Sequence, residues 1–388
     1  MDRNNRLKIL KQLVNIKTVA SNEGEVAKYL SKLFNQYGVK NKLIPQFDGR
    51  DNLVAQIGHH KGPKLAFAGH EDTVHEGNLN KWEFNPFEAT IKDNRLYGRG
   101  VTDMKAGLAA MVVALIELHT ENQTLHGTLR FLATISEELT QGGANHLAKL
   151  GYVDDLDAVI LGEPTGLGIE QNNQHYLVNA HKGALIYTVE SFGKAAHSST
   201  PEKGIDAIEN LINYRNTEKQ LFKGFTERDK ELGSTIYTPD IFRGGQQVNS
   251  IPDYAYQQVM VRTIPQLSNE KIIDKIKNLV NKLNHSGHQN NFKLKVNFSG
   301  NPVKTDKNSE IIKVSRETFN KVTGENLPIK SLSMGTDASQ FTNRNSKLSA
   351  IVFGPGNNTA HQTNEYIDLP SYFNFIEVYK KIAIKYLS

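Results

Sequence analysis

Seven histidine and acidic side chains with metal-ligand character are spread over nearly 300 positions, and each lies where an apolar strand ends or a loop begins. These residues are His70, Asp72, Asp103, Glu137, Glu138, Glu163 and His361. Imidazole and carboxylate groups are the ligands that bind divalent metals such as zinc, and a further carboxylate can take a proton from a water molecule. The set predicts a hydrolase with two metal ions.

The segment Gly69-His70-Glu71-Asp72 places a histidine and an aspartate two residues apart. In such a pair one side chain can bind a metal while the other hydrogen-bonds the imidazole and fixes its orientation. A polar loop that follows a strand would have the same composition. The pair therefore supports a metal site only together with the other candidates.

The adjacent carboxylates of Glu137 and Glu138 follow an apolar strand. Two neighbouring carboxylates repel one another, and burial makes that repulsion more costly unless a cation lies beside them. Successive side chains at a strand end point in different directions. We assign Glu138 as a metal ligand and Glu137 as the general base; the alternative is a solvated acidic turn.

Asp103 follows a glycine-containing stretch, Gly98 to Thr102, and precedes an apolar helix. One aspartate can bridge two metal ions that are about 3.5–4 Å apart. The alternative role of Asp103 is to cap the helix. Glu163 and His361 have no distinctive local motif, so the set as a whole favours their assignment as ligands.

Strand-like and helix-like segments alternate through the first 176 residues. The strands are expected at 52–57, 64–68, 128–135 and 158–161, with a long apolar helix at 104–118. This alternation predicts an open, mostly parallel α/β sheet. Ligands bind beyond the carboxyl ends of the strands in such sheets, and His70, Glu137 and Glu163 lie just past three of those ends.

The pattern changes between residues 178 and 297, where the expected order is β-α-β-β-α-β, with Ser268 capping the second helix. This order is the ferredoxin-like arrangement. From residue 309 the α/β pattern resumes. We therefore expect a catalytic domain formed by 1–177 and 298–388, interrupted by an inserted α+β domain formed by 178–297.

The composition of the 388-residue chain is that of an ordinary globular protein of two domains, with 38% hydrophobic and 22% charged residues. No segment has the apolar core of a signal peptide or a membrane span, and cysteine is absent, so we expect a cytoplasmic enzyme with no disulfides. The 46 Lys and Arg residues are scattered, which disfavours nucleic-acid binding. A net charge of +5 suits an anionic substrate.

These motifs closely resemble the M20 family of metallopeptidases and deacylases over almost the whole chain. In chain order the matching stretches are Gly69–Val74, Gly98–Gly107, Ser136–Glu138, Gly162–Thr165, Gly193–Ser199, Gly244–Pro252 and His361. The resemblance implies two zinc ions per subunit, which cobalt or manganese could replace. It also implies a cis peptide bond after Asp103.

The resemblance further assigns roles to individual residues. One metal would be held by His70, Asp103 and Glu163, and the other by Asp103, Glu138 and His361. Asp72 would orient His70, and Glu137 would act first as base and then as acid.

For the inserted domain, 178–297, the family implies homodimerisation and a lid function. His197 would reach the partner subunit's site and polarise the scissile carbonyl, Asn249 would assist it, and Arg262 would hold a substrate carboxylate. Taken from the residues alone, His197 would be an ordinary loop histidine and Arg262 a surface residue at the end of a strand.

The wording of the motifs is most similar to that of Gram-positive succinyl-diaminopimelate desuccinylases, which implies hydrolysis of N-succinyl-LL-diaminopimelate. Gly335 and Thr336 lie in a loop similar to the one that touches the acyl group in desuccinylases. Met334 and Asp337 depart from that pattern, and an inward-facing Asp337 would repel a succinyl carboxylate. Other N-acyl-amino-acid deacylases, a dipeptidase or carboxypeptidase, and a non-catalytic metal-binding relative are the alternatives.

Overall fold

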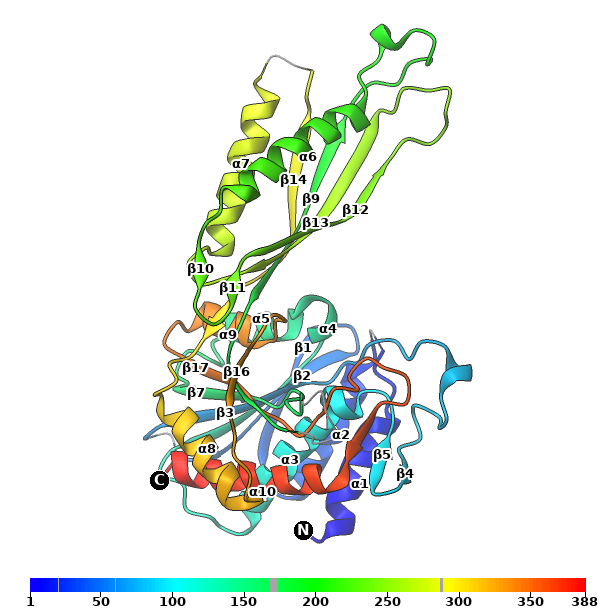
Figure 1. The fold of residues 1–388 in the computed structure, drawn as a ribbon. Coiled ribbons are helices and arrows are strands. Elements are labelled where there is room, and N and C mark those ends of the chain that lie inside the picture. The colour runs from blue at the N-terminus through cyan, green and yellow to red at the C-terminus, as the bar shows by residue number, and fades with distance from the viewer. Residues whose placement is uncertain (20, 60, 168–173, 287–288) are drawn as a thin grey trace. The chain divides into compact units, whose positions relative to one another are not determined.

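The computed structural model describes residues 1–19, 21–59, 61–167, 174–286 and 289–388. The chain forms two units (Figure 1). The first comprises Met1–Ala180, Lys304–Ser331 and Thr336–Ser388, and the second comprises His181–Val303 and Leu332–Gly335. The second unit interrupts the first, at boundaries a few residues beyond the expected 178–297, and the short segment 332–335 was not expected to belong to it.

The first unit is built on a mixed sheet with the order β1-β2-β6-β3-β7-β17-β8-β15, in which β16 also pairs with β8. Its strands are β1 (Lys40–Phe47), β2 (Arg50–Gly58), β3 (Lys64–His70), β6 (Thr128–Thr134), β7 (Ala158–Leu161), β8 (Leu177–His181), β15 (Val303–Lys304), β16 (Ile329–Leu332) and β17 (Ser349–Val352). The central strands β6, β3, β7 and β17 are parallel, whereas β1, β2 and β8 pair antiparallel with their neighbours. The expected mostly parallel α/β sheet is therefore confirmed.

Helices cover both faces of this sheet. Figure 1 shows α3 (Ala106–Thr120), α8 (Glu310–Thr323) and α10 (Leu369–Tyr386) on one side, and α5 (Gly142–Lys149) and α9 (Ala338–Arg344) on the other. Alternate residues of each strand face opposite layers, so both sets are buried, as Leu65 and Ala66 illustrate. The helices α1 (Arg3–Asn15) and α2 (Glu23–Gln36) join α3 and α10 in one core.

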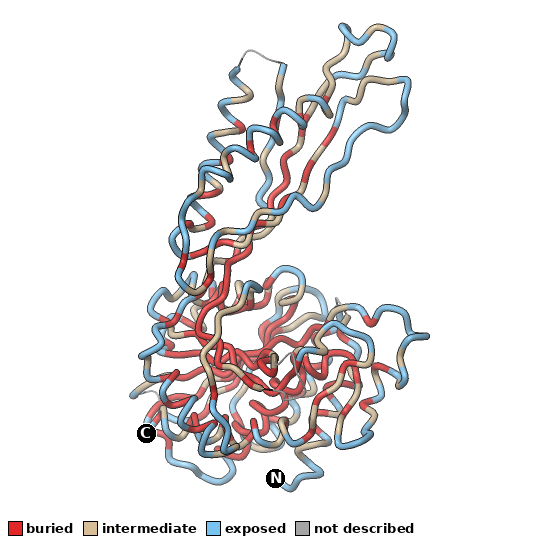
Figure 2. The backbone as a smooth tube through the Cα atoms, in the orientation of Figure 1, coloured by how far each residue is buried: buried red, intermediate tan, exposed pale blue. Residues whose placement is uncertain are grey.

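Helix α3 lies in the middle of that core, and every residue from Ala106 to Leu118 is buried (Figure 2). A helix that is apolar on all sides is expected only where protein surrounds it. Gly107 is required because a Cβ there would lie 1.9 Å from the carbonyl oxygen of Gly162. This close approach holds the start of α3 against the loop that carries Glu163.

The second unit has an antiparallel sheet of order β12-β13-β9-β14, with two helices. Along the chain its main elements are β9 (Gly183–Phe192), α6 (Ala207–Lys223), β12 (Ile236–Gly244), β13 (Tyr254–Thr263), α7 (Asn269–Asn284) and β14 (Phe292–Gly300), with a hairpin of β10 (Arg228–Asp229) and β11 (Gly233–Ser234). The predicted ferredoxin-like order is confirmed. Ser268 also caps α7 as predicted, by accepting a hydrogen bond from the Lys271 N–H.

Some details differ from the sequence prediction. A three-stranded sheet of order β18-β5-β4, comprising β4 (Thr90–Lys92), β5 (Arg95–Tyr97) and β18 (Tyr366–Asp368), was not predicted, because its strands are only three residues long. Among the described residues, no helix is long and apolar enough to cross a membrane.

Candidate metal centre and active site

Three of the predicted ligands and the predicted base lie at the carboxyl ends of the parallel strands. His70 is the last residue of β3, Glu137 and Glu138 begin the short helix α4 (Glu137–Thr140) after β6, and Glu163 follows β7. The Nε2 atom of His70 is 3.6 Å from a Glu163 oxygen. The parallel strands thus bring residues far apart in sequence to one edge of the sheet, as the sequence predicted.

Asp103 connects the two predicted metal positions. Its Oδ1 is 3.1 Å from Nε2 of His70, and its Oδ2 is 3.2 Å from Nε2 of His361. Nε2 of His361 is also 3.1 Å from the Glu138 carboxylate. The Asp103–Met104 peptide bond is cis, as the family resemblance implied. Asp103 is not the cap of α3, since it lies inside an irregular turn at Val101–Lys105.

Two of the loops that hold these groups adopt the left-handed backbone region, which non-glycine residues rarely occupy. His361 has φ of 62°, and Ser136, directly before Glu137, has φ of 61°. Such conformations cost free energy and persist where surrounding contacts impose them. Both lie within one residue of a predicted metal ligand or base.

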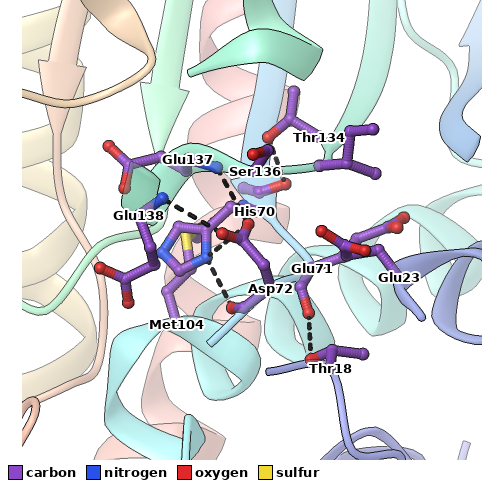
Figure 3. A network of polar contacts seen from close by, with 12 residues as sticks. Thr18, Glu23, His70, Glu71, Asp72, Met104, Thr134, Ser136, Glu137 and Glu138 are labelled. Atoms are coloured by element: carbon purple, nitrogen blue, oxygen red, sulfur yellow. Dashed lines mark hydrogen bonds and ion pairs between the residues drawn. The ribbon is translucent and has the colours of Figure 1, made fainter. Parts of the chain in front are cut away.

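Asp72 fixes the position of the adjacent glutamates (Figure 3). Its Oδ1 accepts the N–H of Glu137 at 3.0 Å, and its Oδ2 accepts the N–H of Glu138 at 3.1 Å. Oδ1 is also 3.6 Å from Nδ1 of His70, while that nitrogen lies 3.0 Å from the backbone oxygen of Asp72. The carboxylate and the backbone of Asp72 therefore both contribute to orienting the neighbours of the metal site.

The ligand cluster has strongly perturbed electrostatics. Burial raises the pKa of Glu163 to about 8, opposed by His70 and assisted by Asp103. Burial likewise raises the pKa of Glu137 well above its usual value, and Glu163 raises it further. Hydrogen bonds with Asp103 and Glu138 raise the pKa of His361 to about 10. Without a metal cation, these carboxylates are therefore either protonated or paired with a protonated histidine.

The imidazole and carboxylate groups of these residues fit a pair of divalent metal ions. Two ligand-atom clusters, each spanning less than 4.8 Å, are formed by His70, Glu137 and Glu163 and by His70, Asp103 and Glu138. His361 adds its imidazole to the second. Two imidazoles and several buried carboxylates in van der Waals range need positive charge between them, and oxygen and nitrogen donors of this kind suit zinc, cobalt or manganese.

A further buried acid, Asp337, lies behind the cluster. Its Oδ2 accepts a hydrogen bond of 2.5 Å from the Thr134 hydroxyl at the end of β6, and its Oδ1 has no hydrogen-bond partner among the residues that the structure describes. Burial raises its pKa to about 7, and its charge raises the pKa of Glu137. Thr336 is buried beside it, whereas Gly335 is half-buried and groups with the second unit.

The remaining predicted residues lie in the second unit, where they form two separate groups. The backbone N–H of Ser198, next to His197, bonds to the carbonyl of Asn249, so these two predicted residues lie together. Arg262 is near the opposite end of β13 from the turn that follows Asn249. Eight residues of strand separate Tyr254 from Arg262, which is roughly 25 Å at 3.3 Å per residue.

The sequence analysis did not identify Arg99 and Glu365, which form a buried ion pair beside the cluster. The Nη1 of Arg99 is 2.5 Å from Oε2 of Glu365, and the two side chains are 2% and 1% exposed. The signal in the sequence was weak: an arginine between two glycines needs a partner when it is buried, but nothing local identified an acid 266 positions away.

A family comparison agrees with this geometry. The model for peptidase family M20/M25/M40 matches residues 66–385. The chain belongs to the M20 family. Over 98% of its length it is 37% identical to a probable succinyl-diaminopimelate desuccinylase of Staphylococcus aureus, of which 97% is covered. It is 26% identical, over 97% of its length and 98% of the relative, to an uncharacterised metallohydrolase of Methanocaldococcus jannaschii.

Solved M20 structures share the fold. An M20 family metallo-carboxypeptidase from Sulfolobus solfataricus superposes with a TM-score of 0.81 at 22% identity, covering 100% of this chain and 99% of the other. The aminopeptidase PepT of Bacillus cereus gives a TM-score of 0.76 at 21% identity, with both chains fully covered. The protein is accordingly an M20 family hydrolase that acts on amide bonds, with a cluster of residues suited to metal binding.

Proposed function

We propose that this M20 protein is a two-metal amide hydrolase that removes a succinyl group from N-succinyl-LL-diaminopimelate. The observation that carries the reaction class is the convergence of His70 and His361 on the two oxygens of Asp103, at 3.1 and 3.2 Å. We assign His70, Asp103 and Glu163 to one zinc, and Asp103, Glu138 and His361 to the other.

Bound zinc would acidify a water molecule and polarise the amide carbonyl. Glu137, which ligates neither metal in this assignment, takes a proton from the attacking water. The water oxygen bonds to the carbonyl carbon, and the C–N bond breaks as Glu137 delivers the proton to the departing nitrogen. The products are a carboxylic acid and an amine. Asp72 keeps Glu137 in place through the N–H that it accepts.

The relationship to the staphylococcal protein supports the succinyl substrate, because 37% identity extends over nearly the full length of both chains. Arg262 supports it as well, since a guanidinium can bind a carboxylate through two parallel hydrogen bonds. An amino acid with several carboxylates also suits the net charge of +5.

A peptidase is the second candidate, and Asp337 is the observation that favours it. Its buried carboxylate adds negative charge beside Glu137, which disfavours a substrate that brings its own carboxylate close to that point. The ammonium group of a peptide would instead be attracted. Peptidases are also prominent among the structural relatives, which include a tripeptidase of Staphylococcus aureus at a TM-score of 0.74.

We also propose that two copies associate through the second unit. Strand β12 pairs only with β13 among the described strands, and it exposes Ile236 at 43% and Phe242 at 44%. A free strand edge with exposed apolar side chains is suited to pairing with another chain. His197 pairs with Ser250 near the Tyr254 end of β13, whereas Arg262 lies near the other end, roughly 25 Å along the strand, so a small substrate does not span both in one chain. Two copies could supply them to one site.

The decisive experiment compares hydrolysis of N-succinyl-LL-diaminopimelate, N-acetylornithine and a dipeptide by the zinc-loaded protein. Preference for the succinyl compound, lost on chelation, supports the proposed substrate; faster dipeptide cleavage supports the second candidate. Glu137→Gln should abolish turnover and retain zinc. A wild-type protein that binds zinc and hydrolyses none of the three would instead favour a binding role.

A further inference from the structure

One buried carboxylate, that of Glu365, joins the turn before Asp103 to the loop after His361. Its Oε1 accepts the N–H of Thr102 at 2.8 Å and the N–H of Asp103 itself at 3.2 Å. Its Oε2 accepts the N–H of Gly100 at 2.9 Å and a hydrogen bond from Arg99. Four donors thus converge on a side chain that is fully buried.

Four donors occupy the roughly four acceptor positions of an ionised carboxylate. Hydrogen bonds from backbone N–H groups to a charged acceptor are among the stronger ones in proteins. Gly100 in this turn has φ of 79°, and a Cβ there would lie 2.2 Å from the Thr73 methyl, so the turn packs closely against Thr73. Glu365 therefore determines where the backbone of Asp103 lies.

Further contacts extend from the same pair to the His361 loop. Arg99 reaches the carbonyl oxygen of His361 with its Nη2 at 3.5 Å. The hydroxyl of Thr102 donates to the carbonyl of Tyr366 at 2.6 Å, and the N–H of Gly98 donates to the carbonyl of Glu365 at 3.0 Å. The Asp103 turn and the His361 loop are consequently connected on both sides of the ion pair.

We propose that Glu365, together with Arg99, is a positioning residue that sets the spacing between Asp103 and His361 and thereby the affinity of the site for its metal ions. This inference rests on the proposed two-metal function. Neither side chain is a ligand in that assignment; both act through the backbone of residues that are. The distance they control is the 3.2 Å between Oδ2 of Asp103 and Nε2 of His361.

A purely structural role is the competing explanation. A buried ion pair as a whole contributes little net stability, but removing one partner leaves the other charge buried and unpaired and destabilises the fold, so folding stability is measured beside metal affinity. Groups that orient metal ligands from outside typically change metal affinity by 10- to 100-fold when they are removed. The two explanations therefore differ in the quantity that should respond.

The test uses Glu365→Gln, with Asp368→Asn as a matched control. Asp368 is three residues further along, and it also forms an ion pair across to β5, 3.0 Å from Arg95, but both side chains are partly exposed. Zinc affinity is measured by competition with a chelator, and the visible absorption of the cobalt-loaded protein reports coordination geometry. Folding is followed by circular dichroism and thermal melting.

We expect Glu365→Gln to lower affinity for at least one metal 10- to 100-fold and to alter the cobalt spectrum, at a temperature where it is fully folded. Asp368→Asn should match the wild type in both. Wild-type affinity and spectrum for Glu365→Gln would overturn the proposal. If that variant does not fold, Arg99→Lys decides: it keeps the charge but cannot bond to Glu365 and His361 together, and unchanged zinc affinity would overturn the proposal equally.

These measurements need no substrate, so they separate the two proposals. A wild-type protein that fails to bind two metals contradicts the proposed function. A wild-type protein that binds two metals, with a Glu365 variant that binds them equally well, contradicts only the positioning role.

Discussion

Replacing Asp72 by asparagine should damage the site out of proportion to the size of the change. The side-chain shape is kept, but one carboxylate oxygen becomes an NH₂ group. In the native structure the two oxygens accept the N–H groups of Glu137 and Glu138 at 3.0 and 3.1 Å. In the variant, one of these N–H groups faces another donor, and the other bonds to a neutral oxygen.

The magnitude follows from these two contacts. A hydrogen bond to a charged group is worth about 1.5–3 kcal/mol, and one to a neutral group about half of that. Losing one bond and weakening the other therefore costs about 2–4 kcal/mol. If this free energy is lost from transition-state stabilisation because the base is misplaced, kcat/KM falls roughly 30- to 1,000-fold, at 1.36 kcal/mol per tenfold.

The assay is steady-state hydrolysis of the best substrate of the wild type, with zinc affinity measured alongside. Glu71→Gln is the matched control, because Glu71 is equally buried but its carboxylate points away from His70 toward Glu23 (Figure 3). Within the described residues neither of its oxygens has a hydrogen-bond partner, and burial raises its pKa well above the usual value, so a neutral glutamine there should leave activity within threefold and stability unchanged or higher. An Asp72→Asn variant that retains activity and zinc affinity within threefold of the wild type would refute this reasoning.

Three further outcomes are expected. Zinc binding at pH 7 should release about two to three protons, and its affinity should rise with pH, because carboxylates raise the pKa of His361 to about 10 and that of His70 well above normal, and burial raises the pKa of Glu163 to about 8. Calorimetry in buffers of different ionisation enthalpy counts the protons. Burial lowers the pKa of His175 to about 4, so its contribution to the free energy of unfolding is complete above pH 6.5 and falls by about 2 kcal/mol between pH 7 and 5. Urea denaturation at both pH values should show a smaller loss of unfolding free energy for His175→Phe than for the wild type. Phe242→Lys should shift a dimer toward monomer in sedimentation, and an unchanged dimer would exclude the β12 edge as the interface.

The architecture was predictable because its strong signals are local. The apolar strands before His70, Glu137 and Glu163 and the mostly apolar helix α3 can each be recognised within about a dozen residues. The rule for parallel sheets then places the carboxyl ends of those strands together. The shortest strands were not predicted because their local signals are weak. Strands of three residues, such as β4, β5 and β18, carry too little periodicity to be recognised.

For the site, residue type identified the proposed ligands and base but not all of the groups that place them. A histidine or a pair of adjacent glutamates is unusual enough to be noticed, and the M20 resemblance added an expected role for each of them. Glu365 is an acid like many others in the sequence. Its proposed role comes from four donors that only the folded chain brings to it, three of them backbone N–H groups that no side-chain pattern records. Asp337 is similar, since its location behind Glu137 depends on a hydrogen bond to Thr134, 203 positions away. A sequence thus predicts the ligands of a metal site more readily than the residues that support them. Substitutions of Glu365 and Asp72 test backbone contacts that the structure shows and the sequence alone does not predict.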